Sequence, residues 1–378
     1  MRTVAGLFAL LAFAGLIYQV AAAWAVRRFM SRPPATPLSR PPVTVLKPLC
    51  GAEPGLEAHL IALLRQGYPQ LQLICGVDSE QDTAVPVVRR VMDQFPQSDI
   101  ALVINPTRHG ANLKIGNLLN MLPEAKHDLL IFSDSDVAAH EDYIDHAVAP
   151  FSDPATGLVT FLYTGRPVPN LASRVGAAGI NHGFLPSALV ALLLGRRDPC
   201  FGATIATTKS MLREIGGLEQ LSDVLADDWV LGAAVRRAGK KLVLASRPVD
   251  MTVTESGTAG LFAHEVRWGR TIATIDRLSY MGSIITQPTM TALLALLLGG
   301  WRWLPLLLAA MILRIMVVRL QEQALQLPSL SLADLLLRDL LSFVVLLTAS
   351  CGRTVLWRGR RYRVERDGRL TLLEGTYS

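Results

Sequence analysis

Cysteine is scarce in this chain of 378 residues, and its four copies stand far apart. Cys50, Cys75, Cys200 and Cys351 lack the short spacing of metal-binding cysteines and the density of a disulfide-stapled domain. We therefore expect reduced thiols in a cytosolic domain. No Gly-x-Gly-x-x-Gly segment follows the first predicted strand, which argues against a dinucleotide-binding Rossmann domain.

Charged residues are also few: they make up 18% of the chain, whereas 51% of it is hydrophobic. The mean hydropathy of +0.34 is too high for an ordinary soluble enzyme and indicates membrane segments. A net charge of +6 would suit nucleic acid, but the basic residues cluster beside apolar runs, at 27–32 and 353–363. Such clusters favour an anionic membrane surface, so we expect a lipid bilayer and no nucleic acid as partner.

Residues 4–26 form an almost uncharged apolar run of the length that a membrane-spanning helix needs. Arg27 and Arg28 follow at once, which places this end in the cytoplasm. A cleaved signal peptide is the alternative, but the run is long and no small-residue cleavage site precedes the basic cluster. We predict a transmembrane anchor over residues 1–27 and a stiff, proline-rich linker over residues 28–42.

Strand-like and helix-like segments alternate from residue 43 onward. Short aliphatic runs predict strands over residues 43–46, 71–77, 101–104 and 128–132, and the segments between them predict helices over 56–66, 84–95 and 112–122. The alternation predicts an α/β domain over residues 43–283, with a mostly parallel sheet flanked by helices on both faces. Ligands of such sheets bind at the carboxyl ends of the strands.

Charged residues follow three of the predicted strands: Lys47 the first, Asp78 the second, and Asp134 with Asp136 the fourth. Each alone is typical of a solvated loop or an Asp-rich turn, but all of them share one edge of the predicted sheet. Residues i and i+2 of a strand face the same side, so Asp134 and Asp136 can converge on one cation. Oxygen ligands favour Mg²⁺ or Mn²⁺ carrying a diphosphate.

A second acidic pair, Asp227 and Asp228, opens a predicted helix. One interpretation is that negative charge favours a helix N-terminus. The other is a general base that takes a proton from an attacking hydroxyl. Lys47 and Lys114 likewise have two interpretations, a phosphate contact or a surface salt bridge.

Two histidines and an Arg-Trp pair stand in apolar surroundings. His182 lies in the apolar stretch 171–194, whose polar residues and proline favour a buried or membrane-surface helix over a membrane span. It is either a core histidine or part of an acceptor pocket. Arg267 and Trp268, after His264, either anchor the chain at the bilayer surface or clamp a diphosphate and stack on a sugar or base.

Apolar runs dominate the C-terminal part, at residues 284–298, 304–318 and 335–349. Two or three helices fit these runs. The basic tail at 351–378 prefers the cytoplasm, which requires an even number of crossings after the domain, so we predict two transmembrane helices over residues 284–350.

From residue 43 to 270 the chain resembles the membrane-bound processive-type glycosyltransferases with a GT-A fold, most closely the ceramide glucosyltransferase family. Residues 43–51 (Val-Thr-Val-Leu-Lys-Pro-Leu-Cys-Gly) look like the family's opening strand and Lys-Pro turn. Asp78, the Asp134-Ser-Asp136 segment and Asp228 match its three aspartate motifs in order. Residues 264–268 (His-Glu-Val-Arg-Trp) occupy the place of its Gln/Arg-x-x-Arg-Trp signature, from which only the first position departs.

Residues 109–123, 201–206 and 225–228 resemble a narrower group, the bacterial glycosyltransferases of hopanoid biosynthesis. This resemblance implies transfer of N-acetylglucosamine from UDP-N-acetylglucosamine to bacteriohopanetetrol, at the bacterial inner membrane with the catalytic domain in the cytoplasm. The broader family implies UDP-glucose and ceramide. A polysaccharide synthase, which needs a longer helical bundle, a lipid-phosphate polyprenyl transferase and a non-catalytic membrane scaffold are the remaining alternatives.

The resemblance implies an inverting, metal-dependent transfer with distinct roles for the residues named above. Asp228 is the expected base, and Asp134 and Asp136 are the expected ligands of Mg²⁺ or Mn²⁺. The nucleotide-sugar site is expected to comprise Lys47, Asp78, Lys114, Asp134, Arg267 and Trp268. The acceptor side is expected to comprise His182, Asp227 and His264.

Overall fold

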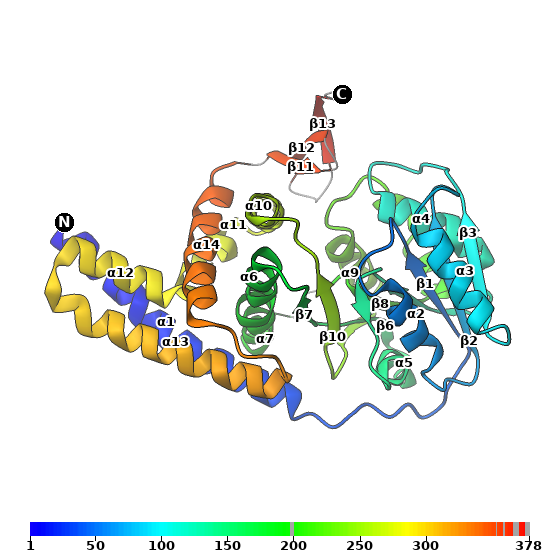
Figure 1. Ribbon diagram of the computed structural model, residues 1–378, viewed down its shortest axis with the longest axis horizontal. Helices are drawn as coiled ribbons and strands as arrows, with labels where there is room; N and C mark the ends of the chain where they lie inside the picture. Colours follow the sequence, from blue (N-terminus) through cyan, green and yellow to red (C-terminus); the bar gives the residue numbers. More distant parts are fainter. Residues whose placement is uncertain (197–199, 353, 358–359, 366–369, 375–378) are drawn as a thin grey trace. The chain divides into compact units, whose positions relative to one another are not determined.

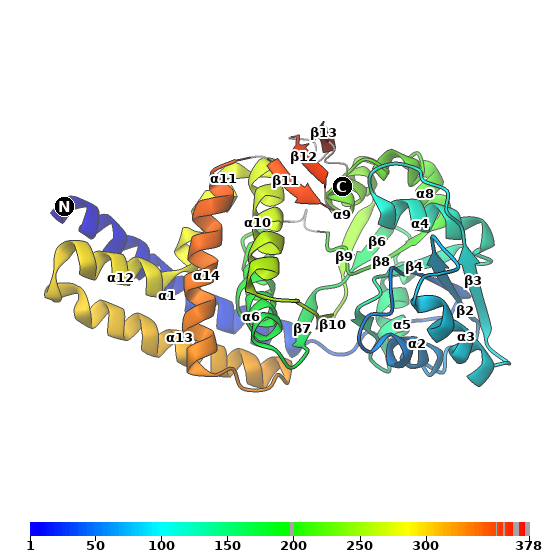
Figure 2. The same ribbon diagram turned by 45° about the horizontal axis from the view of Figure 1, so that its top comes forward.

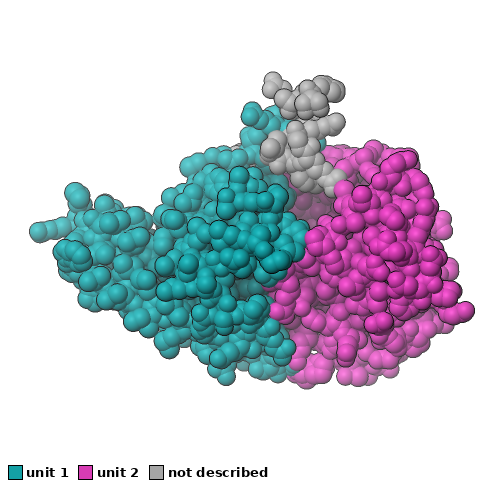
Figure 3. Space-filling view, viewed as in Figure 1, with its two compact units in different colours: residues 1–32, 167–196, 253–378 teal, residues 33–166, 197–252 magenta. Residues whose placement is uncertain are grey.

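The computed structural model describes residues 1–196, 200–352, 354–357, 360–365 and 370–374. The chain divides into two compact units, coloured separately in Figure 3. The sheet unit comprises residues 33–166 and 197–252, and the helical unit comprises residues 1–32, 167–196 and 253–378. The sequence-based boundary at 43–283 differs from this division, because residues 167–196 and 253–283 form helices that pack with the N- and C-terminal helices.

A seven-stranded sheet forms the centre of the sheet unit (Figure 1). Its strands are β1 (Val43–Pro48), β2 (Leu71–Val77), β3 (Asp99–Ile104), β4 (Leu129–Ser133), β6 (Thr156–Thr160), β8 (Thr204–Thr208) and β9 (Lys241–Leu244). They lie in the order β3-β2-β1-β4-β8-β6-β9. All pairs are parallel except the two that β8 makes with β4 and β6, which confirms the predicted mostly parallel sheet.

Helices cover both faces of this sheet, because its central strands are apolar on both sides. Val45, Leu73 and Ile131 point into one core with the helices α2 (Leu56–Leu64), α3 (Ala84–Gln94) and α5 (Tyr143–Val148). Their chain neighbours Leu46 and Ile74 point into the opposite core, which is formed with α4 (Leu113–Met121), α8 (Lys209–Glu214) and α9 (Asp227–Arg237). Alternation along each strand thus fixes both helical layers.

A second, three-stranded sheet has the order β5-β10-β7 and was not predicted. Its strands are β5 (Val137–Ala138), β7 (Tyr163–Pro167) and β10 (Val249–Val253). Only Phe161 and Leu162 separate β7 from β6 of the central sheet. β5 directly follows the Asp134–Asp136 segment and pairs antiparallel with β10, so this small sheet holds one end of that segment.

The helical unit contains eight α-helices in its described residues. They are α1 (Arg2–Met30), α6 (Leu171–Gly179), α7 (Leu185–Leu193), α10 (Thr258–Ile275), α11 (Arg277–Gly282), α12 (Pro288–Gly299), α13 (Leu304–Leu325) and α14 (Leu332–Ser350). Small residues such as Ala12, Ala292 and Ala310 let α1, α12 and α13 pack closely. Figure 2 shows α6, α10 and α14 side by side.

Three helices in the described part of the chain are long and apolar enough to cross a membrane: Arg2–Met30, Leu171–Leu193 and Trp301–Leu325. A fourth candidate is the pair Arg277–Thr286 and Pro288–Gly299, which is bent by 75°. The second of these segments was predicted to be a buried or membrane-surface helix because of its polar residues and proline. It continues because a π-helical turn, Ile180–Phe184, joins α6 to α7 and Pro186 falls in the first turn of α7, where proline is tolerated.

The basic C-terminal tail contains the antiparallel strands β11 (Thr354–Trp357), β12 (Arg360–Val364) and β13 (Leu370–Glu374). Residues 353, 358–359, 366–369 and 375–378 of this predicted tail lie outside the described residues. Arg361 and Arg363 are exposed and alternate with buried Tyr362 and Val364. This period of two is a strand signal that the charge of the segment obscured.

Ion pairs fasten α14 to its neighbours inside the helical unit. Arg314 of α13 donates from Nη2 to Asp339 Oδ1 at 2.9 Å, and both side chains are buried. The Arg314 Nη1 donates to the carbonyl of His182 in the π-helical turn at 3.2 Å. Arg338 pairs with Glu265 of α10 at 2.5 Å, and Arg174 of α6 pairs with α14 at 2.9 Å.

We expect Arg314→Leu to destabilise the protein by about 3–5 kcal/mol, because Asp339 would keep a buried charge without its partner. Thermal unfolding in detergent measures the change. The double variant Arg314→Leu, Asp339→Leu should recover most of the loss. Arg277→Leu, at an exposed position of α11, is the matched control and should change stability by no more than about 0.5 kcal/mol. Equal stability of Arg314→Leu and the native protein would contradict the expectation.

Candidate functional site

The carboxyl ends of β1, β2 and β4 form one edge of the central sheet, because these strands run parallel. Lys47 lies near the end of β1, Asp78 directly follows β2, and residues 134–136 directly follow β4. The structure thus places the residues predicted from the strand ends along one edge. Asp78 is largely exposed there, and Arg108 Nη2 donates to its Oδ2 at 2.8 Å.

The sequence had suggested that Asp134 and Asp136 continue the strand β4. In the structure they lie in a turn after it. β4 ends at Ser133, and Val137 N donates to Asp134 O at 3.2 Å, which closes the turn. The two carboxylates therefore approach each other because the chain turns, and not through strand alternation. Burial, followed by the charges of Asp134 and Glu53, raises the pKa of Asp136 to about 7.

The ammonium of Lys47 is fully buried beneath this turn. It donates to Asp134 O at 2.6 Å and to Val137 O at 3.1 Å, and lies 3.4 Å from Ser133 Oγ. Burial lowers the pKa of Lys47 to about 8, although nearby acids partly offset the effect. These contacts give Lys47 a role in holding the turn, and its contact with a phosphate remains a prediction.

Lys114 lies in the first turn of α4 and faces the acidic residues of both segments. Its Nζ lies 2.5 Å from Asp134 Oδ1 and donates to Gly202 O at 2.9 Å. Burial works against the ammonium, but Asp134, Asp227 and Asp228 together raise the pKa of Lys114 above its ordinary value. One cation thus offsets the charge of several carboxylates.

Asp227 and Asp228 occupy the first turn of α9 and are partly buried. Asp228 Oδ1 accepts from the backbone N–H of Trp229 at 2.7 Å. Burial, followed by the charge of Asp227, raises the pKa of Asp228 to about 7. Burial also raises the pKa of Asp227, against the opposing effect of Lys114. A carboxyl group that titrates near neutrality suits a general base.

The segment before α4 joins the two acidic segments. Asn112 caps α4 by accepting from Lys114 N, while its Nδ2 donates to Val224 O at 2.8 Å and to Asp227 Oδ1 at 3.3 Å. Gly110 is required at its position, because a Cβ there would lie 2.5 Å from Ser222 O. The first part of the 109–123 segment singled out in the sequence therefore positions Lys114 between the aspartates.

The donor set of this edge fits a divalent cation that brings further ligands with it. Asp136 Oδ1 is buried and has no hydrogen-bond partner among the described residues, and Asp134 lies beside it. Within the described part of the chain, no three His, Cys, Asp or Glu side chains converge as a complete metal site. Two carboxylates with water and diphosphate oxygens are the usual ligands of protein-bound Mg²⁺.

Sequence reasoning missed two residues of this edge. Glu53, in the loop after β1, accepts from Ser135 Oγ at 2.9 Å. Tyr163 of β7 faces the same acids: burial, followed by the charges of Asp228, Asp136 and Asp134, raises its pKa above the ordinary value. Glu53 follows a strand end at a distance of five residues, so only the intervening turn, with Gly51 at φ 79°, brings it back to the edge.

The other predicted site residues belong to the helical unit. His182 lies in the π-helical turn, with Nδ1 3.0 Å from Gln321 Oε1, and is buried. His264 and Trp268 lie one turn apart on α10 with an edge-to-face ring contact of 4.4 Å, and Glu255 Oε1 lies 2.8 Å from His264 Nδ1. Arg267 follows on the same helix and is partly buried.

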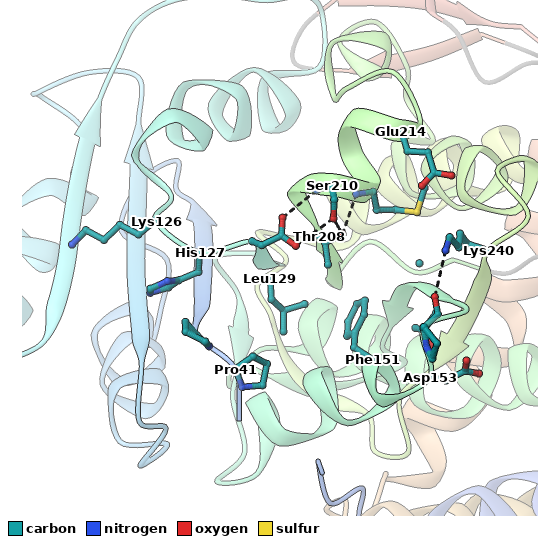
Figure 4. Close-up of a pocket in the computed structure, with 16 residues that line it drawn as sticks. Pro41, Lys126, His127, Leu129, Phe151, Asp153, Thr208, Ser210, Glu214 and Lys240 are labelled. Carbon is teal, nitrogen blue, oxygen red and sulfur yellow. Dashed lines mark hydrogen bonds between the residues drawn. The ribbon is translucent and has the colours of Figure 1, made fainter. Parts of the chain in front are cut away.

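A cavity of about 640 Å³ lies at the opposite edge of the central sheet (Figure 4). Leu129 at the start of β4 and Thr208 at the end of β8 line it, as do Phe151, Lys126 and Lys240. None of the described residues that line it belongs to the predicted site. The Asp128 carboxylate accepts hydrogen bonds from the backbone N–H and the hydroxyl of Ser210 and therefore holds the β8–α8 turn.

Comparison with known proteins gives one family match over nearly the whole chain. The family model described as glycosyl transferase family 21 matches residues 7–370. Ceramide glucosyltransferase 1 of Caenorhabditis elegans is 26% identical over 278 residues, which cover 69% of this chain and 58% of that protein. Ceramide glucosyltransferase of Pyricularia oryzae is 32% identical over 157 residues, 34% of this chain and 32% of that protein. The chain thus spans about half the length of the Caenorhabditis elegans relatives it matches.

A solved structure confirms the predicted GT-A type of fold. The mannosyltransferase PcManGT from Pyrobaculum calidifontis, determined in complex with GDP-Man and Mn²⁺, is similar with a TM-score of 0.54. The similarity covers 92% of this chain and 97% of that one, at 19% sequence identity.

The raised pKa of Asp228 predicts a pH-dependent stability. A carboxyl group with a raised pKa stabilises the folded state at low pH, and this contribution is lost as the pH rises through about 7. Asn does not titrate, so we expect the free energy of unfolding of Asp228→Asn to rise by about 1–3 kcal/mol relative to that of the native protein between pH 5 and pH 8.5. Thermal unfolding with a metal chelator present measures it. Asp99→Asn, a partly exposed position paired with Lys126, is the control and should show no trend. A constant difference between Asp228→Asn and native protein would contradict the prediction.

Proposed function

Because this chain belongs to glycosyl transferase family 21, we propose that it transfers a sugar from a UDP-sugar to the hydroxyl group of a membrane lipid, with inversion at the anomeric carbon. The observation that carries this proposal is the meeting of four aspartates around Lys114 at the carboxyl edge of the sheet, where one buried Asp136 oxygen has no partner in the described residues. The presence of apolar helices of membrane-spanning length supports a lipid acceptor.

The nucleotide-sugar is proposed to bind at the strand ends. Asp78 would accept hydrogen bonds from the uridine, and Asp134 and Asp136 would hold Mg²⁺ or Mn²⁺. When bound, the cation offsets the charge of the departing UDP as a Lewis acid. Arg267 and Trp268 of α10 are proposed to contact the diphosphate and the sugar or base. Lys47 and Lys114 are proposed to add contacts to the phosphates, besides holding the acidic turn.

The transfer itself is proposed to be a single displacement. Asp228 accepts the proton of the acceptor hydroxyl while the hydroxyl oxygen attacks the anomeric carbon from the face opposite the diphosphate. The bond from that carbon to the diphosphate oxygen breaks, and UDP leaves. Asp227, one residue away but bonded to Asn112, is the alternative base. His182 and His264 are proposed to lie on the acceptor side.

The proposed acceptor is bacteriohopanetetrol and the proposed sugar is N-acetylglucosamine, on the strength of the three segments that resemble the hopanoid branch. Ceramide and UDP-glucose are the second candidates, favoured by the ceramide glucosyltransferases among the relatives. We propose a multi-pass protein of the bacterial inner membrane with the sheet unit in the cytoplasm. Arg27 and Arg28 in the last turn of α1 support this orientation.

Replacing the proposed base tests the mechanism. We expect Asp228→Asn to lower turnover about 100-fold or more, since general base catalysis contributes that much, while UDP and Mn²⁺ still bind. UDP release by detergent-purified protein and calorimetric titration with UDP measure the two properties. Asp99→Asn, far along the chain in an exposed ion pair, should keep native turnover. Native turnover in Asp228→Asn would refute its role, and loss in Asp227→Asn alone would reassign the base.

The acceptor is tested by comparing lipids under one set of conditions. We expect metal-dependent UDP release with UDP-N-acetylglucosamine and bacteriohopanetetrol, and little release with ceramide or without lipid. Release with UDP-glucose and ceramide alone would replace the hopanoid assignment by the ceramide one. No release with any lipid, by a protein that binds no UDP, would contradict the transferase proposal.

A further inference from the structure

The middle residue of the acidic turn, Ser135, is held by two side chains outside every motif considered so far. Ser135 Oγ donates to Glu53 Oε2 at 2.9 Å. Nδ1 of His59, on α2, lies 3.3 Å from Ser135 O. Glu53 and His59 both come from the segment that directly follows β1. This one segment therefore contacts both the side chain and the backbone of Ser135.

The imidazole of His59 connects three elements of the sheet unit. It is 7% exposed, and its Nε2 lies 3.3 Å from Thr252 Oγ1 of β10. A carbonyl oxygen only accepts, so Nδ1 carries the proton toward Ser135 and Nε2 accepts from the Thr252 hydroxyl. Burial, with Lys47 nearby, lowers the pKa of His59, which agrees with a neutral ring.

Each backbone carbonyl of the acidic turn has its own partner. Lys47 Nζ donates to Asp134 O, and His59 Nδ1 donates to Ser135 O. The backbone N–H of Thr252 donates to Asp136 O at 2.9 Å. The carboxylates of Asp134, Asp136 and Glu53 lie near one another and repel. Fixed carbonyls keep the turn from opening under this repulsion.

We propose that His59 and Glu53 are positioning residues that hold the Asp134–Asp136 turn ready for a divalent cation and its diphosphate. His59 acts by donating to the Ser135 carbonyl, and Glu53 acts by accepting from the Ser135 hydroxyl. The inference rests on the proposed function. Neither side chain is a ligand: each fixes the backbone from which Asp134 and Asp136 reach the cation.

The test measures Mn²⁺ binding in the presence of UDP, by calorimetry on the detergent-purified full chain without acceptor. His59→Leu should weaken Mn²⁺ binding about 10-fold or more, the usual effect of losing an outer partner of a metal ligand. His59→Asn keeps an N–H donor near the Nδ1 position and should stay within about 3-fold of native. His127→Leu, at the opposite edge of the sheet, is the matched control. If His59→Leu does not fold, His59→Gln replaces it.

Glu53 is tested by the same titration with two variants. Glu53→Ala should weaken Mn²⁺ binding, whereas Glu53→Gln keeps an oxygen for the Ser135 hydroxyl and should restore most of it. Equal losses in Glu53→Gln and Glu53→Ala would overturn its positioning role. Native binding in His59→Leu, or equal losses in His59→Leu and His59→Asn, would overturn that of His59. If the native protein itself binds no Mn²⁺ with UDP, the proposed function fails. If the native protein binds Mn²⁺ and the variants bind it equally well, only the positioning role fails.

Discussion

The acidic edge of the sheet unit depends on two lysines that come from neighbouring structural elements. Parallel strands end together, so any carboxylates that follow them are brought close and repel. Lys47 offsets this repulsion by donating to the backbone of the turn, and Lys114 offsets it by pairing with the Asp134 carboxylate. The position of Lys114 in turn requires the cap of Asn112 and the close approach at Gly110.

A similar constraint governs the helical unit. Arginine and acidic side chains are costly among apolar helices unless each is paired. The pairs here join different helices: Arg314 with Asp339, and Arg338 with Glu265. α10, which carries Arg267 and Trp268, is therefore fastened through its own Glu265 to α14. The charges that interrupt the C-terminal apolar runs serve as ties between helices, which explains why they tolerate burial.

The central sheet and the charged residues at its strand ends were predictable from the sequence. Apolar strands buried on both faces give a strong signal, and the charged residues come directly after them. β2 was predicted at Leu71–Val77, as observed. The small sheet was not predictable, because β5 has two residues and its partner β10 is distant in the chain. Glu53 and His59 were missed for the same reason: their importance comes from contacts with Ser135, some 80 residues away.

The helical unit was harder to predict where polar residues interrupt apolar runs. Polar residues such as His182 favoured a buried or membrane-surface helix over a membrane span, whereas the observed helix has spanning length. A π-helical turn accommodates Asn181 and His182, and Arg314 donates to the carbonyl of His182. Such compensation depends on a residue more than 100 positions further on, which local patterns do not contain. The strands of the C-terminal tail were hidden by their arginines in the same way.

The chain passes between the two units four times, at residues 32, 166, 196 and 252. β8 lies between β4 and β6 in the sheet, but it is made only after the apolar α6–α7 segment. During synthesis, the apolar α6–α7 segment therefore leaves the ribosome before β8, the antiparallel strand of the sheet. The seven-stranded sheet can close only once residues 204–208 have emerged, so this apolar segment leaves the ribosome while the sheet is still open.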